Sequence, residues 1–230
     1  ALHVPVTVEV VPDKNWIIES NSSWEAIVAN NITIFPHLDL DTPPTQKSDS
    51  IYIHPGTGFG TGHHATTHML LILLQKLPAH VSVTHALDVG TGSGILALAA
   101  ERLFSCQVDA CDTDPYALDN ARVNLNLNGI DQDKIFLTTD TVESFSNSYD
   151  LVMANLYAEI LIEMAETLVK KTKQGGAVLI SGILTELWED VSATFLAIPD
   201  CKLCEVMRSE DLPEHAKTEK QWIAARLQRT

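Results

Sequence analysis

The sequence lacks the features by which membrane-spanning and secreted proteins are recognised. No apolar run in its 230 residues approaches the roughly 20 residues that span a bilayer. The first residues do not show the basic, apolar and small segments of a signal peptide. The chain begins with Ala1 rather than Met, which leaves open a missing N-terminal segment. We therefore expect a cytoplasmic protein with no attachment to a membrane.

Cysteine is scarce and forms no complete metal motif. The four cysteines are Cys106, Cys111, Cys201 and Cys204, and only the last two form a C-x-x-C pair. Residues 201–207 have the pattern of a strand, in which positions three apart point to opposite faces. This placement disfavours zinc, and without secretion signals we expect reduced thiols.

Basic residues are also few. The 15 Lys and Arg residues stand against 30 Asp and Glu, which gives a formal net charge of −15. An acidic surface repels phosphate backbones, so a nucleic acid is disfavoured as direct substrate and a basic protein partner is favoured. The alternative is that the charge only aids solubility. No feature of the sequence indicates an oligomeric state.

From residue 84 onward, strand and helix patterns alternate, which predicts a parallel sheet with crossover helices. Strands are expected over residues 84–89, 107–112, 135–138, 150–154, 177–181, 202–207 and 221–227. Helices are expected over residues 94–103, 115–128, 157–171 and 185–196, the third of them stopped by Gly175 and Gly176. No helix separates the last two strands, so one of them is expected to run antiparallel at an edge.

The first 47 residues differ from the rest. Val4, Val6, Val8 and Val10 alternate with other residues, like a strand with one buried face, and residues 41–49 look like a linker. We expect a short β-rich N-terminal extension over residues 1–47, which is either a small module or a remnant of a substrate-recognition domain. One α/β domain then covers residues 48–230.

A glycine-rich turn follows the first strand of this domain. Asp88 precedes Gly90, Gly92 and Gly94, and Ile95 stands where a dinucleotide fingerprint would have its third glycine. Glycines at a strand end let the backbone approach a ligand. This spacing suits a nucleoside with a zwitterionic amino-acid tail rather than a pyrophosphate. The Asp88 carboxylate is placed to accept hydrogen bonds from the amino group of such a tail, directly or through water.

Other strand ends also carry polar side chains. Asp112 follows the next strand about 20 residues later, where an acidic residue binds ribose hydroxyls, and Asp114 already fills the role of helix cap. Asp140 suits either an adenine amino group or a solvated loop. Asn155 suits either a cap of the next helix or a group that aligns an amine acceptor without ionising. Tyr157 is a candidate substrate contact.

Residues 54–67 form a second glycine-rich segment, ahead of the sheet. A flexible loop in this position can fold over a cofactor and exclude water. We expect Phe59 to cover the ligand, and Thr66 or Thr67 to donate hydrogen bonds to it.

Histidines in and after this segment raise the question of a metal site. His64 and His68 stand four residues apart, but no Glu lies between them in the H-E-x-x-H manner. A third ligand would have to be His54 or His63. Roles as ligand contacts or as polar loop residues are therefore favoured over metal binding.

Taken together, these motifs resemble the PrmA family, the bacterial methyltransferases of the large-subunit ribosomal protein L-eleven. The matching motifs are P-G-x-x-F-G-T-G-x-H-x-T-T at residues 55–67, D-x-G-x-G-S-G-I-L-A at 88–97, D-x-D-P at 112–115, A-x-x-N-x-x-x-N-G at 121–129, A-N-L at 154–156 and S-G-I-L at 181–184. The resemblance covers about residues 51–230. The first motif is specific to the family, whereas the second is general to class I methyltransferases.

The resemblance implies a doubly wound, seven-stranded, mostly parallel Rossmann-like α/β fold. It also implies S-adenosylmethionine as cofactor and transfer of its methyl group to amines of a protein. The residues that it places at the cofactor are Phe59, His64, Thr67, Gly90, Asp112 and Asn155. The sequence departs from the family at His54, where Asp is usual, and in residues 1–47, which are too short for a complete recognition domain.

Fold alone does not determine the substrate, so several functions remain open. A protein amine methyltransferase is the first, a small-molecule methyltransferase on the same fold is the second, and a non-catalytic cofactor-binding module is the third. A nicotinamide-dependent oxidoreductase is the fourth, and the glycine spacing argues against it. In the first reading, Asn155 orients the attacking amine for an in-line displacement and does not deprotonate it.

Overall fold

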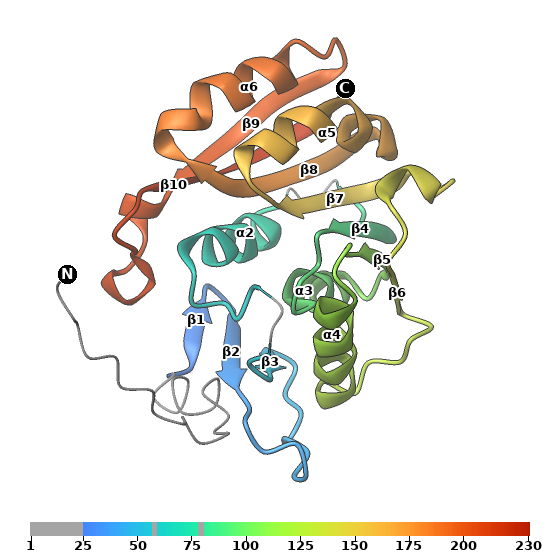
Figure 1. Cartoon of the computed structure of the whole chain (residues 1–230), viewed down its shortest axis with the longest axis vertical. Coiled ribbons are helices and arrows are strands. Elements are labelled where there is room, and N and C mark those ends of the chain that lie inside the picture. The colour runs from blue at the N-terminus through green and yellow to red at the C-terminus, as the bar shows by residue number, and fades with distance from the viewer. Residues whose placement is uncertain (1–24, 57–58, 78–80) are drawn as a thin grey trace, which may run out of the picture.

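The computed structural model describes residues 25–56, 59–77 and 81–230, which form two sheets and the helices around them (Figure 1). The strand expected over residues 4–10 lies outside the described residues. Among the described helices, none combines the length and the apolarity needed to cross a bilayer.

The large sheet has seven strands in the order β6-β5-β4-β7-β8-β10-β9. Its strands are β4 (His85–Val89), β5 (Gln107–Cys111), β6 (Ile135–Thr138), β7 (Tyr149–Asn155), β8 (Thr172–Leu184), β9 (Cys201–Arg208) and β10 (Trp222–Arg229). The pairs among β4 to β8 are parallel, whereas β10 runs antiparallel to both β8 and β9. The predicted doubly wound, mostly parallel sheet is therefore confirmed.

The place of the antiparallel strand differs from the prediction. It was expected at an edge, but β10 lies inside the sheet between β8 and β9. The chain first crosses to the outermost position as β9 and then returns to fill the gap beside β8. Ile223, Ala224 and Ala225 are consecutive buried residues of β10, as expected for a strand covered on both faces.

Helices cover both faces of this sheet (Figure 1). They are α2 (Ala65–Gln75), α3 (Ile95–Phe104), α4 (Pro115–Leu127), α5 (Ala158–Lys171) and α6 (Trp188–Leu196), with short 3-10 helices at Val142–Ser144, Thr185–Leu187, Ser209–Asp211 and Glu214–Ala216. Buried residues of α2 and α3 belong to one apolar core, and those of α5 and α6 belong to a second core on the other face. This two-sided burial explains why the central strands are almost continuously apolar.

The start of α4 follows from local chemistry. Asp114 caps the helix by accepting a hydrogen bond from the Tyr116 N–H at 2.9 Å, and Pro115 occupies the first helical position. At the other end Asn128 is the C-cap, and Gly129 adopts the left-handed conformation that glycine tolerates. The predicted start and end of this helix are confirmed.

The end of α5 at Lys171 was predicted correctly, but the role given to the two glycines that follow it was wrong. The helix stops at Lys171 and β8 begins at once with Thr172, so Gly175 and Gly176 lie inside the strand. The pairing of β7 with β8 shifts register at this point, which marks a bulge. A side chain at Gly176 would press on backbone oxygens of Asp150 and Lys173. The glycines therefore shape the bulge and do not end the helix.

The small sheet is formed by β1 (Ile27–Ala29), β2 (Ile32–Pro36) and β3 (Ser50–Ile53). β1 and β2 form a hairpin, and β2 pairs in parallel with β3. Its buried isoleucines share the apolar core of α2 and α3. The pairing of β2 with β3 thus joins residues on both sides of residue 47. The predicted boundary between the N-terminal extension and the α/β domain at that residue stays a prediction.

Candidate functional site

A crevice of about 800 Å³ opens where the carboxyl ends of β4, β5 and β7 meet. Ligands of open α/β sheets bind at this edge, outside the strand ends. The wall residues that lie at or just beyond these strand ends are Val89, Gly90, Gly92, Cys111, Asp112, Thr113, Asp114, Asn155, Leu156 and Tyr157. The remaining wall comes from the second glycine-rich segment, α4, the loop after β6, α5, β8 and β10.

The turn after β4 supplies the floor of the crevice. Gly90, Gly92 and Gly94 have left-handed φ angles of 70°, 55° and 80°, which side-chain-bearing residues rarely adopt. A Cβ at Gly92 would clash with the carbonyl oxygen of Phe59. Glycine is therefore required at position 92 by the close approach of Phe59 as well as by the backbone conformation.

Asp112 joins this turn to the end of β5. One carboxylate oxygen accepts the Gly92 N–H at 2.9 Å, and the other accepts the Asp114 N–H at 3.0 Å. Two hydrogen bonds leave a carboxylate with further acceptor capacity, because its two oxygens offer about four lone-pair sites. The structure thus brings Asp112 and Gly90 into one crevice wall, as the sequence predicted.

Asp88 lies beneath the turn and does not line the crevice. Its side chain is fully buried, and one oxygen accepts the Thr91 hydroxyl at 2.7 Å and the Ala97 N–H at 3.2 Å. The other oxygen has no hydrogen-bond partner among the described residues. Burial, with a smaller contribution from the nearby Asp112 charge, raises the pKa of Asp88 to about 7. In this structure Asp88 stabilises the turn through these hydrogen bonds.

The second glycine-rich segment packs directly on the glycine-rich turn after β4. The Ser93 N–H donates to the Phe59 carbonyl at 2.9 Å, and the Ser93 hydroxyl donates to the Gly60 carbonyl at 2.5 Å. The Phe59 ring is 58 % exposed at the mouth of the crevice and lies 5.4 Å from the His64 ring. His64 in turn lies 5.0 Å from the Trp222 ring, and burial lowers the His64 pKa. These three rings form one row along the wall.

Asn155 stands at the end of β7, the strand next to β4. Its Nδ2 donates to the Thr67 hydroxyl at 3.2 Å. Thr67 is itself fully buried and does not line the crevice, whereas Thr66 does. Thr67 therefore lies behind Asn155, and Asn155 is the residue of this pair that lines the crevice. Asp140, after β6, also lines the crevice, and Tyr157 is a 70 % exposed lining residue.

The histidines that raised a metal question make other contacts, and the cysteines of the C-x-x-C pair lie on β9. His64 Nδ1 bonds to the Thr66 hydroxyl at 2.8 Å, and burial together with His215 lowers the pKa of His68 to about 4. Cys201 is buried on β9, and Cys204 is only partly buried. Within residues 25–56, 59–77 and 81–230, no group of three or more His, Cys, Asp or Glu side chains is arranged to hold a metal ion.

Sequence reasoning missed several residues of the wall, among them Glu143 and Glu163 as well as Gly182 and Trp222. Gly182 was part of the S-G-I-L motif but was not assigned to the site; its φ of 90° and the close carbonyl of Leu156 both require glycine. Trp222 reaches the crevice only because β10 lies inside the sheet. No local pattern predicts that position.

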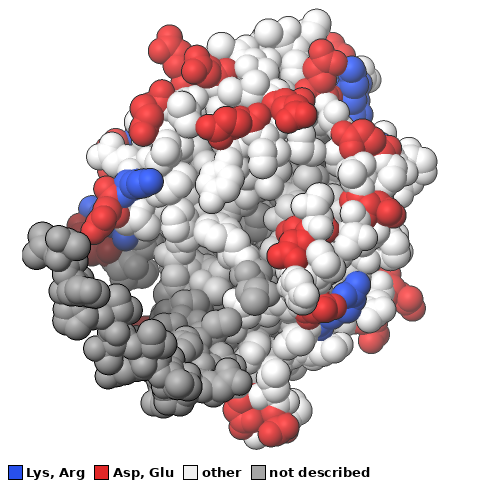
Figure 2. Space-filling view, viewed as in Figure 1, with Lys and Arg blue, Asp and Glu red and all other residues white. Residues whose placement is uncertain are grey.

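The crevice wall is acidic. Its charged residues are Asp112, Asp114, Asp140, Glu143 and Glu163, and no Lys or Arg stands among its described lining residues. Acidic side chains also outnumber basic ones on the face that Figure 2 presents. The local field therefore favours a cationic group at this site.

Comparisons with known proteins agree with this geometry. A family model described as ribosomal protein L11 methyltransferase (PrmA) matches residues 2–212. The ribosomal protein L11 methyltransferase of Campylobacter concisus is 34 % identical over 206 residues, which are 90 % of this chain and 70 % of that protein. The protein of the same name from Rhizobium meliloti is 38 % identical over 196 residues, which are 83 % of this chain and 67 % of that protein.

A solved structure is also similar. The ribosomal protein L11 methylase of Lactobacillus delbrueckii subsp. bulgaricus superimposes with a TM-score of 0.73 and 28 % identity, covering 90 % of this chain and all of that one. The chain spans 70 % and 67 % of the length of the two curated relatives above, and 62 % of a third, from Pelobacter propionicus. The predicted family resemblance is confirmed.

Proposed function

The chain belongs to the family of ribosomal protein L11 methyltransferases, and from that premise we propose how its crevice works. It binds S-adenosylmethionine against the Gly90–Gly94 turn and transfers the methyl group to amino groups of a protein. The proposed acceptor is a basic ribosomal protein, with L11 as the first candidate because the relatives are named for it. We further propose that the protein acts in the cytoplasm.

The observation that carries this proposal is the meeting of Asp112 with the glycine turn in one crevice. A volume of about 800 Å³ lies within the range of roughly 300–1,000 Å³ typical of small-ligand pockets. Asp112 is a charged acceptor for ribose hydroxyls, and Val89, Cys111 and Leu156 offer apolar surface to an adenine ring. The residues present therefore fit the proposed cofactor.

Bound S-adenosylmethionine supplies an activated methyl group on a sulfonium. The protein has to place an amine in line with that carbon and keep its lone pair directed at it. Asn155 suits this task, because its Nδ2 is held by Thr67 and its Oδ1 remains the atom that accepts a hydrogen bond from the amine. An amide does not ionise, so Asn155 orients the amine and leaves its proton to pass to solvent. Tyr157 at the rim is a candidate contact for the acceptor chain.

The acidic wall suits the proposed acceptor. A lysine side chain arrives as an ammonium, since its ordinary pKa is about 10.4. Carboxylates at Glu143 and Glu163 attract that charge toward the crevice. The same field repels phosphate, so a nucleic acid is not proposed as direct substrate. The extension over residues 1–47 is proposed to contribute to substrate recognition, and the cofactor-binding domain is proposed to cover residues 48–230.

Two measurements test the proposal. Calorimetry with S-adenosylmethionine should show saturable binding to one site, and labelled methyl groups should then appear on a purified basic ribosomal protein. Asn155→Ala should lower kcat by about 10²-fold or more, because the amine loses its orienting partner. The control is Asn126→Ala on the exposed side of α4. Absence of binding heat would refute the cofactor assignment, and binding without transfer to any ribosomal protein would favour a small-molecule acceptor.

A further inference from the structure

One motif of the sequence has no role in the proposed chemistry. Asn120, Asn124 and Asn128 stand four residues apart along α4 and therefore form one stripe. They are 8 %, 0 % and 3 % exposed. Burying an amide costs free energy unless its donors and acceptors are satisfied, so three buried asparagines on one helix need specific partners.

Their partners are backbone groups of the chain that leads into the second glycine-rich segment. Asn128 Oδ1 accepts the Tyr52 N–H at 2.9 Å, and its Nδ2 donates to the Tyr52 carbonyl at 2.7 Å. Asn124 Oδ1 accepts the His54 N–H at 2.7 Å, and Asn120 Nδ2 donates to the His54 carbonyl at 3.1 Å. β2 occupies one edge of β3, and the asparagine stripe provides hydrogen bonds to the other.

Asn124 differs from the other two because it bonds to both glycine-rich segments. While its Oδ1 holds the His54 N–H, its Nδ2 donates to the Ser93 carbonyl at 2.8 Å. Ser93 in turn binds the Phe59 and Gly60 carbonyls with its N–H and hydroxyl. One buried amide therefore links the chain entering the second segment to the turn on which that segment folds back.

The orientation of the Asn124 amide is determined by its partners. A flipped amide would point its NH₂ group at the His54 N–H and its oxygen at the Ser93 carbonyl, so both contacts would become repulsive. Asn124 thus needs one donor and one acceptor in fixed places. A side chain that only filled space would not need this polarity.

We propose that Asn124 is a positioning residue that sets the distance between the two glycine-rich segments and thereby the affinity for the cofactor. The inference rests on the proposed function, because it takes these segments as the cofactor site. Asn124 does not line the crevice and acts only through His54 and Ser93.

Asn128 provides a matched control. It is equally buried on the same helix and holds the same strand, but its bonds reach only Tyr52 and the Asn124 carbonyl. Asn128→Asp should therefore disturb the docking of β3 without touching the Gly90–Gly94 turn. Asn126→Asp, on the exposed side of α4, controls for the added charge alone.

The test compares Asn124→Asp with Asn128→Asp and Asn126→Asp. Asn124→Asp keeps the shape but removes the donor to the Ser93 carbonyl, so S-adenosylmethionine should bind about tenfold or more weakly by calorimetry. Asn128→Asp should lower Tm about as much as Asn124→Asp does, yet change the Kd for S-adenosylmethionine by less than about threefold. Asn126→Asp should change neither Tm nor Kd. Affinity of Asn124→Asp should recover as the pH is lowered, because a protonated carboxyl again donates to Ser93.

A second readout needs no cofactor. The Ser93 N–H and the neighbouring Gly92 N–H should exchange with solvent faster in Asn124→Asp than in the wild-type protein, and Asn128→Asp should leave them unchanged. Equal affinity and equal exchange for Asn124→Asp and Asn128→Asp would overturn the inference. If Asn124→Asp does not fold, Asn124→Ala replaces it, since it removes the same donor without a charge. A wild-type protein that fails to bind the cofactor would refute the proposed function, while the exchange comparison would still decide the role of Asn124.

Discussion

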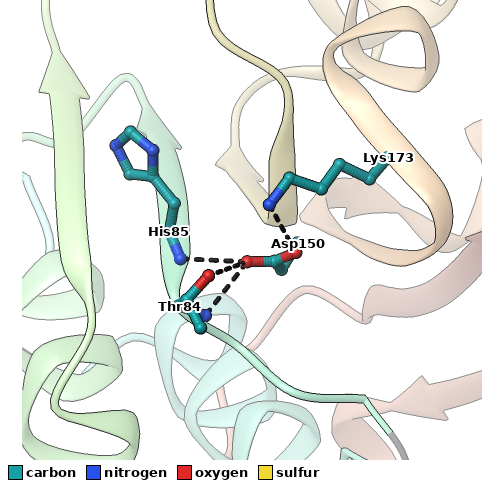
Figure 3. Close-up of polar contacts among 4 residues, drawn as sticks. All are labelled: Thr84, His85, Asp150 and Lys173. Carbon is teal, nitrogen blue, oxygen red and sulfur yellow. Dashed lines mark hydrogen bonds and ion pairs between the residues drawn. The ribbon is translucent and has the colours of Figure 1, made fainter.

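At the amino end of the large sheet, Asp150 is surrounded by donors, whereas at the carboxyl end Asp88 and Asp112 retain unused acceptor capacity. One Asp150 oxygen accepts the Thr84 N–H at 3.0 Å, the Thr84 hydroxyl at 2.7 Å and the His85 N–H at 3.0 Å (Figure 3). The other oxygen pairs with the Lys173 ammonium at 2.7 Å. These bonds tie the starts of β4, β7 and β8 together.

The two ends differ in pKa as well. Partial burial alone would raise the pKa of Asp150, but Lys173 and the donors of Thr84 and His85 outweigh it and lower that pKa to about 2. At the other end burial dominates, and the pKa of Asp88 rises to about 7. Asp150 thus stabilises the amino end of the sheet. Asp88, on the neighbouring parallel strand, remains incompletely paired at the carboxyl end, where a ligand is proposed to bind.

The largest effect is expected from removing the paired carboxylate. Asp150→Ala eliminates the ion pair and leaves the Thr84 and His85 N–H groups without their acceptor, which should cost roughly 3 kcal/mol and lower Tm by roughly 6–12 °C. Cofactor affinity should not change, because the crevice lies at the opposite end. Thermal unfolding and calorimetry check both points, with the exposed Asp133→Ala as control. A loss of affinity would show that the two ends are coupled.

The same carboxylate makes a pH prediction. The folded pKa of Asp150 is about 2, below its ordinary value near 3.8, so its contribution is present above about pH 4 and disappears as the pH falls toward 2. The wild-type protein should therefore lose about 2 kcal/mol more stability than Asp150→Ala over that interval. Denaturant unfolding at several pH values measures the difference, and parallel curves for the two proteins would contradict it.

At the carboxyl end, Asp112→Asn should act on binding instead. An amide loses the charge that strengthens bonds to ribose hydroxyls, so S-adenosylmethionine should bind roughly 10–30-fold more weakly, or about 1.5–2 kcal/mol. Tm should fall by less than in Asp150→Ala, because one oxygen still accepts a backbone N–H while the new NH₂ group faces the other. Asp114→Asn is the matched control, since it removes the same charge from the same wall and retains a good helix cap. Equal losses in both variants would indicate a general charge effect.

Asp88→Asn should reverse the pH dependence seen at Asp150. The folded pKa of Asp88, about 7, lies above its ordinary value, so the folded state binds a proton between about pH 4 and 7 that the unfolded state does not. Stability of the wild-type protein should fall as pH rises through this window. Asp88→Asn lacks that loss and should gain about 1 kcal/mol or more relative to wild type between pH 5 and 8. A constant Tm difference across this range would contradict the raised pKa.

The smallest effect is expected from Lys173→Met. The Lys173 side chain is 44 % exposed, and the three bonds from Thr84 and His85 to Asp150 remain. Solvent screens such a pair, so the loss should stay below about 1 kcal/mol in thermal unfolding. A loss as large as that of Asp150→Ala would mean that the ion pair, and not the backbone donors, dominates the amino end.

Some elements were predictable because their signals are local. The bounds of α4 follow from Asp114, Pro115 and Gly129, and the strand at 135–138 was predicted with its observed bounds. Gly175 and Gly176 misled the prediction, since a glycine pair after a helical pattern resembles a helix stop. Only the pairing of β8 with β7 shows that these glycines serve a bulge.

The candidate site divides in the same way. Asp112 and Gly90 were predicted to meet because parallel strands bring their carboxyl ends to one edge. Thr67 was expected at the cofactor but lies behind Asn155, since the direction of its side chain depends on how α2 packs. Trp222 was not predicted at all, because a residue near the end of the chain joins the wall only through the order of strands.

The order of residues by itself determined the alternating strands and helices, the glycine turn with its strand-end carboxylates, and the family. These depend on spacing and conformational preference, which act over a few residues. Tertiary structure alone decided that β10 lies inside the sheet, that Asp88 lies below the crevice floor while Asp112 lies on its wall, and that Asn124 joins two distant segments. Those outcomes depend on burial and on partners from elsewhere in the chain, which no local pattern contains.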